Sequence, residues 1–248
     1  WDFGFLGLLA ALLVGVAVRP RSKLLQALVA AIFGLLFLQD QNRLWPSFYQ
    51  FWFLLLILLS YRTRSAANEA ARILAGVRFA LAAVYFWCGV QKLTPHFFYE
   101  EFPWFIEPVL EWLPFRVPGI PVAGMFAAVF EILIGIGLLT TRFRTIALIE
   151  ALLMHSLIFM CIGPLRDGWN NSAWIWNLAV CLQVVVAFAK APAFSWSAMF
   201  DAPRAHCVPQ ALAVVFLGVL PVLNNLNCWD SALSFNVYTG NVDYAEIH

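Results

Sequence analysis

Long apolar runs separated by short polar loops dominate this sequence. Crossing a bilayer as a helix takes about 20 residues and sometimes as few as about 17, and eight runs meet or approach this length. They lie at residues 3–18, 24–39, 44–60, 74–94, 118–140, 145–163, 172–189 and 209–226. The pattern predicts an all-α polytopic membrane protein with about eight transmembrane helices, of which the first two are short and need support from neighbours.

The longest connection between two runs, residues 94–117, is rich in Trp, Phe and Glu and is interrupted by prolines. We expect it to form short helices that lie in the membrane interface with their apolar faces down. Such a loop can cover an outward-facing cavity as a lid, or it can serve only as an aromatic anchor.

The sequence becomes polar near its C-terminal end. We therefore divide it into a transmembrane helical domain, residues 1–226, and an exterior C-terminal cap, residues 227–248. Strand-like residues from Ser234 to Tyr238 and a turn at residues 239–241 leave two interpretations open, a β-hairpin in the cap or the start of a larger exterior domain. Because the sequence begins at Trp1 rather than at a methionine, we expect residues to precede it.

Basic residues fall mainly on one side of the predicted helices. If Trp1 lies outside, ten of the fifteen Lys and Arg residues fall at inner loops, as the positive-inside rule requires. These ten are Arg19, Arg21, Lys23, Arg62, Arg64, Arg72, Arg142, Arg144, Lys190 and Arg204. The sequence therefore predicts a multi-pass protein, expected in a bacterial inner membrane, with both termini on the exterior, periplasmic side.

Composition supports a membrane location and narrows the function. The chain is 62% apolar and only 12% charged, about half the charged fraction of a soluble domain. Its net charge of +1 gives no support for nucleic-acid binding, and it contains no Walker loop, GxGxxG, HExxH or CxxC motif. His155 is the only histidine within a predicted helix, so we expect no metal site.

A few polar side chains interrupt the predicted helices. They are Arg78, Lys92, Glu131, Glu150, His155 and Asn177. An ionisable group in hydrocarbon costs about 2.5 to 3.5 kcal/mol by insertion scales, so each must face protein, water or a partner. Arg78 and Glu150 both lie within roughly two helical turns of the inner surface. We expect them to form a structural ion pair.

Lys92, His155 and Asn177 fall toward the outer ends of three predicted helices and can converge on one outward-opening cavity. Two interpretations of Lys92 stay open. It can be an interfacial anchor whose ammonium reaches water, or it can be desolvated among aromatic side chains and act as a neutral amine base. His155 can likewise be a hydrogen-bonded packing residue or can orient a reacting oxygen.

Several motifs occur together in this sequence. They are "LQDQNRLWP" at residues 38–46, "VYFWCGVQKL" at residues 84–93, and the spacing of Glu131, Arg144 and His155. In this order they resemble the horizontally transferred transmembrane (HTTM) family, which includes the membrane domain of vitamin K-dependent gamma-carboxylase. The resemblance covers residues 24–188 and implies a multi-helix membrane fold with its site on the exterior side.

The resemblance also implies roles for individual residues. Lys92 matches a lysine regarded as the base that starts oxygenation of vitamin K hydroquinone. His155 matches a histidine of the membrane core, and Glu131 matches an aspartate there. The positions that match a motif for holding the second and third helices in place are Asp40, Asn42, Arg43 and Trp45.

The sequence departs from the carboxylase pattern at two places. Leu24, Leu25 and Gln26 stand where the carboxylase has an Asn-His-Tyr-like element, and Gln91 replaces the first lysine of a Lys-Lys pair. The resemblance therefore does not extend to carboxylation of glutamate in a protein substrate.

The sequence thus leads to two functional hypotheses. In the first, an exterior-facing cavity holds a quinone-like or other lipophilic ligand, with Lys92 and His155 as catalytic residues of a redox or oxygenation reaction. The residues expected to bind that ligand are Trp87, Gln91, Trp104 and Asn177. In the second, the protein is a non-catalytic membrane subunit that anchors a partner protein or redox complex, surrounded in either case by membrane lipid.

Overall fold

The protein is described by a computed structural model that covers all residues except 1, 41–42, 44, 62–65, 164–170 and 240–248. Within the covered ranges the chain forms helices and no strand. The longer helices are α1 (Asp2–Val18), α2 (Lys23–Gln39), α3 (Pro46–Leu59), α4 (Ala66–Gln91), α6 (Ile120–Leu139), α7 (Arg144–Ile162) and α8 (Asn171–Phe188). The shorter ones are α5 (Phe102–Leu110), α9 (Trp196–Met199) and α10 (Val208–Ala213).

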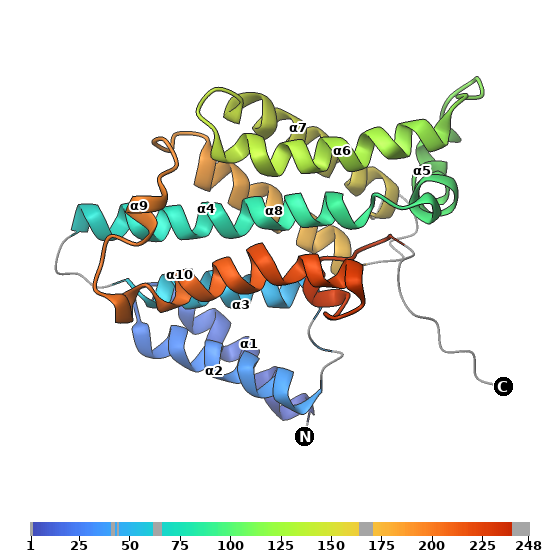
Figure 1. The fold of residues 1–248 in the computed structure, drawn as a ribbon. Helices are drawn as coiled ribbons and strands as arrows, with labels where there is room; N and C mark the ends of the chain where they lie inside the picture. Colours follow the sequence, from blue (N-terminus) through green and yellow to red (C-terminus); the bar gives the residue numbers. More distant parts are fainter. Residues whose placement is uncertain (1, 41–42, 44, 62–65, 164–170, 240–248) are drawn as a thin grey trace.

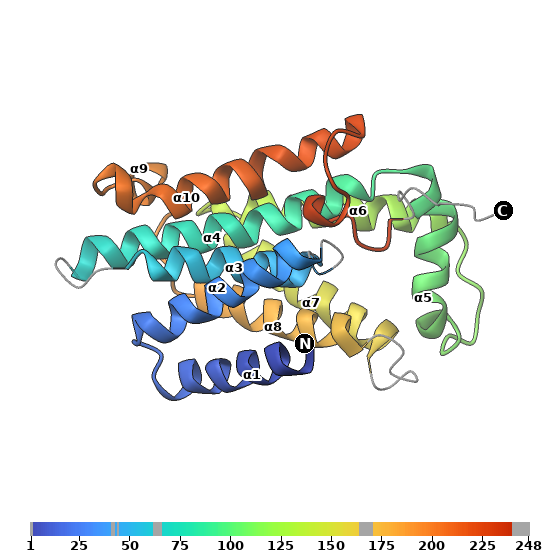
Figure 2. The ribbon, with the colours of Figure 1, turned by 90° about the horizontal axis from the view of Figure 1, so that it is seen from below.

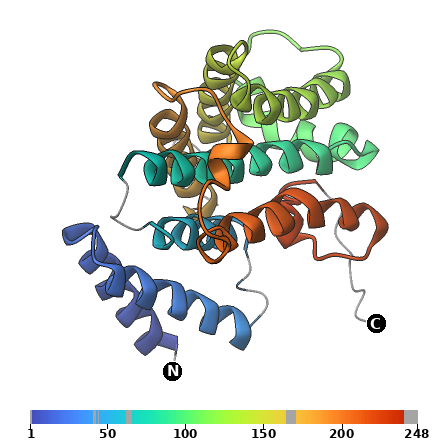
Figure 3. The same cartoon turned by 60° about the vertical axis from the view of Figure 1, so that its left-hand side comes forward.

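The long helices run side by side, with α4 in the middle of the molecule (Figure 1). On one side α4 contacts α6 and α8, and α7 packs against both. On the other side it contacts α3 and α10, and α2 packs against α3. Figure 3 shows the α1–α2 hairpin at one edge of this arrangement. Among the other long helices, α4 therefore packs against α3, α6 and α8.

Four helical segments are long and apolar enough to cross a membrane by length and composition. They are Asn68–Gln91, Ile120–Leu139, Arg144–Ile162 and Val208–Leu226, the last of which continues α10 through a π-helical and a 3-10 segment. Four shorter apolar helices accompany them: Leu6–Val18, Lys23–Gln39, Pro46–Leu59 and Ala173–Phe188. The all-α prediction is confirmed for the described residues, and the apolar helices indicate a membrane protein.

The two ends of the helix array differ. At the end where α4 finishes at Gln91, the loop predicted to be helical forms a short π-helical segment, Phe97–Glu101, followed by α5. Figure 2 shows α5 lying across the ends of the long helices. We call this the α5 end. The loops that join α1 to α2, α6 to α7 and α8 to α9 lie at the opposite end. In or directly next to these loops lie six of the ten basic residues assigned above to the inner side: Arg19, Arg21, Lys23, Arg142, Arg144 and Lys190.

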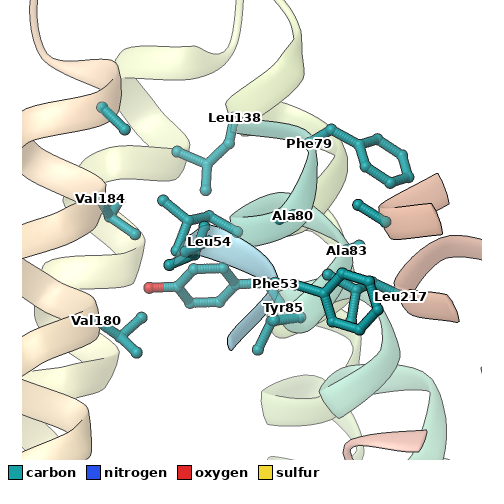
Figure 4. Close-up of a cluster of buried hydrophobic side chains, with 14 of the residues drawn as sticks. Phe53, Leu54, Phe79, Ala80, Ala83, Tyr85, Leu138, Val180, Val184 and Leu217 are labelled. Atoms are coloured by element: carbon teal, nitrogen blue, oxygen red, sulfur yellow. The ribbon is translucent and has the colours of Figure 1, made fainter. Parts of the chain in front are cut away.

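An apolar cluster around α4 fills the centre of the molecule (Figure 4). Side chains from α3, α4, α6, α8 and the segment after α10 meet there. Those labelled in Figure 4 are Phe53, Leu54, Phe79, Ala80, Ala83, Tyr85, Leu138, Val180, Val184 and Leu217. Because lipid is as apolar as these side chains, helix association in a bilayer depends on close packing of such surfaces rather than on exclusion of water.

Two glycines bring α4 and α6 into backbone contact. A Cβ on Gly89 would lie 2.7 Å from the carbonyl oxygen of Ala128, and one on Gly135 would lie 2.7 Å from that of Ala82. Contacts this short are sterically forbidden, so both positions require the missing side chain of glycine. Small residues at helix contacts allow this close approach in membranes.

Helix α4 begins at Ala66, earlier than the apolar run that starts at residue 74, and its first turns contain the buried Arg72. The guanidinium donates hydrogen bonds to Ser60 Oγ at 3.0 Å, to the Ser60 carbonyl at 2.8 Å and to the His206 carbonyl at 2.7 Å. Lys23 Nζ donates to the Leu58 carbonyl at 2.8 Å. These two cations donate to carbonyl groups in the last turn of α3 and at Ser60, which follows it, where the negative end of the helix dipole lies.

The β-hairpin prediction for the C-terminal cap is wrong in its described part. Ala232–Ser234 forms a 3-10 turn, and Phe235 and Tyr238 have φ angles of 60° and 53°. Left-handed backbone of this kind interrupts an extended strand. Phe235 is fully buried, so packing against the helices overrides the strand preference of its neighbours. Residues 240–241 of the predicted turn lie outside the described residues.

Candidate functional site

An apolar cavity of about 380 Å³ lies between α4, α6, α7 and α8. It is next to the α5 end, where aromatic side chains of the outer loop line it, among them Phe97, Phe102 and Phe105. Tyr238 from the C-terminal segment also lines it and packs against Phe105, with the ring centroids 5.6 Å apart and the ring planes tilted by 46°. The connection at residues 94–117 therefore covers one end of the cavity, which is the position expected for a lid.

Lys92 and Glu131 form an ion pair at this cavity. Lys92 follows the last residue of α4, and Glu131 lies on α6. Lys92 Nζ is 2.5 Å from Glu131 Oε2, and the two side chains are only 15% and 8% exposed. The Gly89 contact described above lies one turn before Lys92 and holds the two helices close enough for this pair. A buried carboxylate beside the ammonium stabilises the charged form of the lysine.

A second polar group at the cavity is a hydrogen-bonded chain of Tyr85, His155 and Asn177. Asn177 Nδ2 donates to the Ala173 carbonyl at 2.8 Å, which leaves Asn177 Oδ1 as an acceptor for His155 Nδ1–H, also at 2.8 Å. In a neutral imidazole the other ring nitrogen is then an acceptor. Tyr85 Oη lies 2.5 Å from His155 Nε2 and so donates its hydrogen to it. The chain fixes the tautomer of His155 and the orientation of Tyr85.

Tyr85 was not predicted as a site residue, although the sequence contained a signal for it. Tyr85 and Cys88 on α4 and Lys92 just past its end are spaced by three and four residues, and all three line the cavity. Positions i, i+3 and i+7 share one helix face. A helical projection through Lys92 would therefore have included Tyr85.

The residues predicted to bind the ligand divide into two groups. Asn177 lines the cavity, whereas Trp87, Gln91 and Trp104 are not among its lining residues. Trp87 Nε1 donates to the Gly218 carbonyl at 3.1 Å, and Gln91 Nε2 donates to the Pro221 carbonyl at 3.1 Å. Both side chains therefore hold α4 to the helix that follows α10. Trp104 lies on α5 and is 44% exposed.

The predicted ion pair between Arg78 and Glu150 is wrong. Arg78 Nη1 donates to the Pro192 carbonyl at 2.8 Å, and its guanidinium lies over the Phe188 ring at 5.0 Å. Glu150 instead lines the cavity from α7. The guanidinium thus bonds to one carbonyl and packs against aromatic rings at and beyond the end of α8, rather than pairing with a carboxylate.

The motif at residues 40–45 is only partly described. Asp40 Oδ2 lies 3.5 Å from Arg43 Nε, so these two residues form an ion pair in the connection between α2 and α3. This agrees with a structural role. Asn42 lies outside the described residues. Among the residues that are described, no group of three or more His, Cys, Asp and Glu side chains could hold a metal ion.

Comparison of the chain with models of protein families, with curated proteins and with solved structures gave no match. The functional argument therefore depends on the geometry of the cavity and on the residues that line it.

Replacing Asn177 with leucine should destabilise the protein by about 1 to 3 kcal/mol, because His155 Nδ1–H loses its acceptor inside a buried site. The free energy of unfolding in detergent measures the effect. Ser156→Ala is the control, since Ser156 is exposed and bonds only to the Leu152 carbonyl of its own helix. Equal stability of the two variants would show that the hydrogen bond from His155 to Asn177 does not stabilise the protein.

Proposed function

We propose that this protein is a multi-pass membrane protein of the HTTM type that binds a quinone-like lipophilic molecule at the cavity beside the α5 end. The observation that carries the proposal is the combination of an apolar, aromatic-covered cavity with the Lys92–Glu131 pair and the Tyr85–His155–Asn177 chain on its walls. Apolar pockets with a few converging polar groups are typical ligand sites.

The proposal includes eight membrane crossings, with the α5 end on the exterior side. The four shorter apolar helices are about 20 to 26 Å long at about 1.5 Å per residue, against a hydrocarbon thickness of about 30 Å. Contacts with the longer helices and local bilayer thinning support such lengths. The concentration of Lys and Arg at the opposite end favours this orientation.

The position of the cavity supports a ligand that arrives from the membrane. Phe130 on α6 and Leu153 and Leu157 on α7 line the cavity and are also exposed on the protein surface. The cavity thus reaches the apolar face formed by α6 and α7. A ring system can lie inside while its hydrocarbon tail extends along that face into lipid.

The ion pair changes the role expected for Lys92. An ammonium 2.5 Å from a carboxylate is not a neutral amine base. In the proposed step a hydroquinone hydroxyl transfers its proton to the Glu131 carboxylate, and the Lys92 ammonium stabilises the ring oxyanion that remains. His155 acts through Tyr85, whose hydroxyl oxygen can accept a hydrogen bond from the second ring hydroxyl.

The test is binding of a short-chain naphthohydroquinone to the purified protein in detergent micelles, measured by equilibrium dialysis. Lys92→Ala should weaken binding about tenfold to a hundredfold, which corresponds to loss of one hydrogen bond to a charged group. Lys92→Arg should weaken it less, because the positive charge remains. Lys190→Ala, at an exposed lysine beyond α8, is the control and should bind as the wild type does.

The acid–base step has a separate readout. The absorption of bound hydroquinone should show the anion at a lower pH in the wild type than in Lys92→Ala, since the ammonium favours the negative ring oxygen. If both Lys92 variants are folded and bind and ionise the hydroquinone as the wild type does, the proposed role of the pair is wrong.

A further inference from the structure

We infer a second binding site, for an anionic glycerophospholipid, in a groove at the opposite end of the molecule. The groove has a volume of about 1220 Å³ and lies between the start of α2, the end of α3, the first half of α4 and the end of α8. It shares no lining residue with the cavity beside α5. We call it the basic groove, because Arg21, Lys23 and His206 line it.

The basic groove has an apolar wall suited to an acyl chain. Ile73, Leu74 and Val77 line it from α4, and Val186 lines it from α8. Val186 is 85% exposed, so this wall continues onto the surface that faces lipid in a membrane-spanning arrangement. One occupant can therefore place its charged part at Arg21 and Lys23 and its hydrocarbon part along the helices.

The charges that line the basic groove leave one positive charge for a ligand. Among the lining residues that the structure describes, Arg21 and Lys23 are cations and Glu69 is the one carboxylate. Glu69 acts on Lys23 electrostatically. Two positive charges and one negative charge match a ligand with a single negative charge, as in a phosphodiester. Basic pockets between helices on the cytoplasmic side commonly bind such head groups.

The availability of the two cations differs. Lys23 Nζ is bonded to the Leu58 carbonyl and lies 5.4 Å from the centre of the Tyr61 ring, so it is fixed at the rim of the groove. Arg21 is exposed and forms no ion pair or side-chain hydrogen bond with any residue that the structure describes. Its planar guanidinium can bind two phosphate oxygens at once. Arg21 is therefore the main phosphate contact.

Gln26 provides an independent indication of a ligand. Its side chain lines the basic groove and is only 9% exposed. Nε2 donates to the Pro20 carbonyl at 2.6 Å, whereas the buried Oε1 has no hydrogen-bond donor among the described residues. A buried acceptor without a partner is costly. Rotation of this side chain toward the groove would let a head-group hydroxyl donate to Oε1, which favours a phosphatidylglycerol-type lipid over one without hydroxyl donors.

The inference is tested by native mass spectrometry of the whole chain in detergent. The protein is mixed with equal amounts of phosphatidylglycerol and phosphatidylethanolamine that carry the same acyl chains. The wild type should retain one phosphatidylglycerol in preference to phosphatidylethanolamine. Arg21→Gln should reduce its retention about fivefold, the effect of about one basic residue near an anionic lipid. Arg19→Gln is the matched control, since Arg19 is exposed in the same turn but does not line the groove.

Two further arms identify the head-group contact and the source of the phosphate. The wild type should prefer phosphatidylglycerol over phosphatidylmethanol, which has the same charge but no hydroxyl, and Gln26→Leu should remove that preference. Inorganic phosphate should not displace the lipid. The inference is overturned if the wild type retains phosphatidylethanolamine equally, if the Arg19 and Arg21 variants lose the same amount of lipid, or if inorganic phosphate competes at equal concentration.

Discussion

Replacing Lys92 with methionine should destabilise the protein by about 3 to 5 kcal/mol, one of the two largest effects expected from a single substitution in this chain. The cause is not the lost attraction itself. The Glu131 carboxylate, whose side chain is 8% exposed, would remain buried without its partner. The free energy of unfolding, measured in detergent with a denaturing co-detergent, provides the number.

The double variant Lys92→Met/Glu131→Leu separates this explanation from a general packing defect. Removing both charges should restore most of the lost stability, because no uncompensated charge remains. The same double variant should be folded and still fail to bind the hydroquinone, which distinguishes the structural from the functional role of the pair. Additive losses in the double variant would contradict an energetic coupling between the two side chains.

Replacing Gly135 with alanine should also be severe, with a loss of at least about 1 to 3 kcal/mol in the free energy of unfolding. The new Cβ would meet the Ala82 carbonyl oxygen at 2.7 Å, and backbone atoms cannot move aside as a flexible side chain can. Helices α4 and α6 must separate instead. Because Lys92 directly follows α4 and Glu131 lies on α6, we expect weaker hydroquinone binding as well.

Gly34→Ala on α2 is the matched control for this prediction. A Cβ there would approach only the Trp52 side chain, at 3.8 Å, which is ordinary van der Waals contact. Alanine is favoured over glycine within a helix by about 1 kcal/mol. Gly34→Ala should therefore be neutral or stabilising. A similar loss in both variants would show that close approach is not what matters at Gly135.

The positions of the helices were predictable from the sequence because membrane-spanning backbone must satisfy its own hydrogen bonds, which long apolar runs do as helices. The start of α4 was not predictable. Its first turns contain Glu69 and Arg72, which resemble a polar loop in sequence. Arg72 is nevertheless fully buried, because carbonyl groups from two other segments accept its hydrogen bonds. Partners so distant in sequence leave no local signal.

Part of the candidate site was predictable because polar residues stand out within apolar helices. Lys92, His155 and Asn177 interrupt apolar runs, and all three line the cavity. Gln91 and Trp87 were assigned to the same site from their closeness in sequence to Lys92. Successive residues of an α-helix are rotated by about 100°, so a neighbour in sequence points to a different helix face. The partnership of Glu131 with Lys92 depends on the packing of α4 against α6, which the sequence alone does not specify.

The cations at the end of α3 have a consequence for the order of assembly. Lys23 precedes α3 in the chain and Arg72 follows it, yet both donate to carbonyl groups in its last turn and at Ser60. Helix α3 has only 14 residues, about 21 Å. Its end therefore becomes complete only when α2 and α4 are in place on either side. During synthesis, α3 is expected to settle at its final depth after α4 has emerged, as the last member of a three-helix unit.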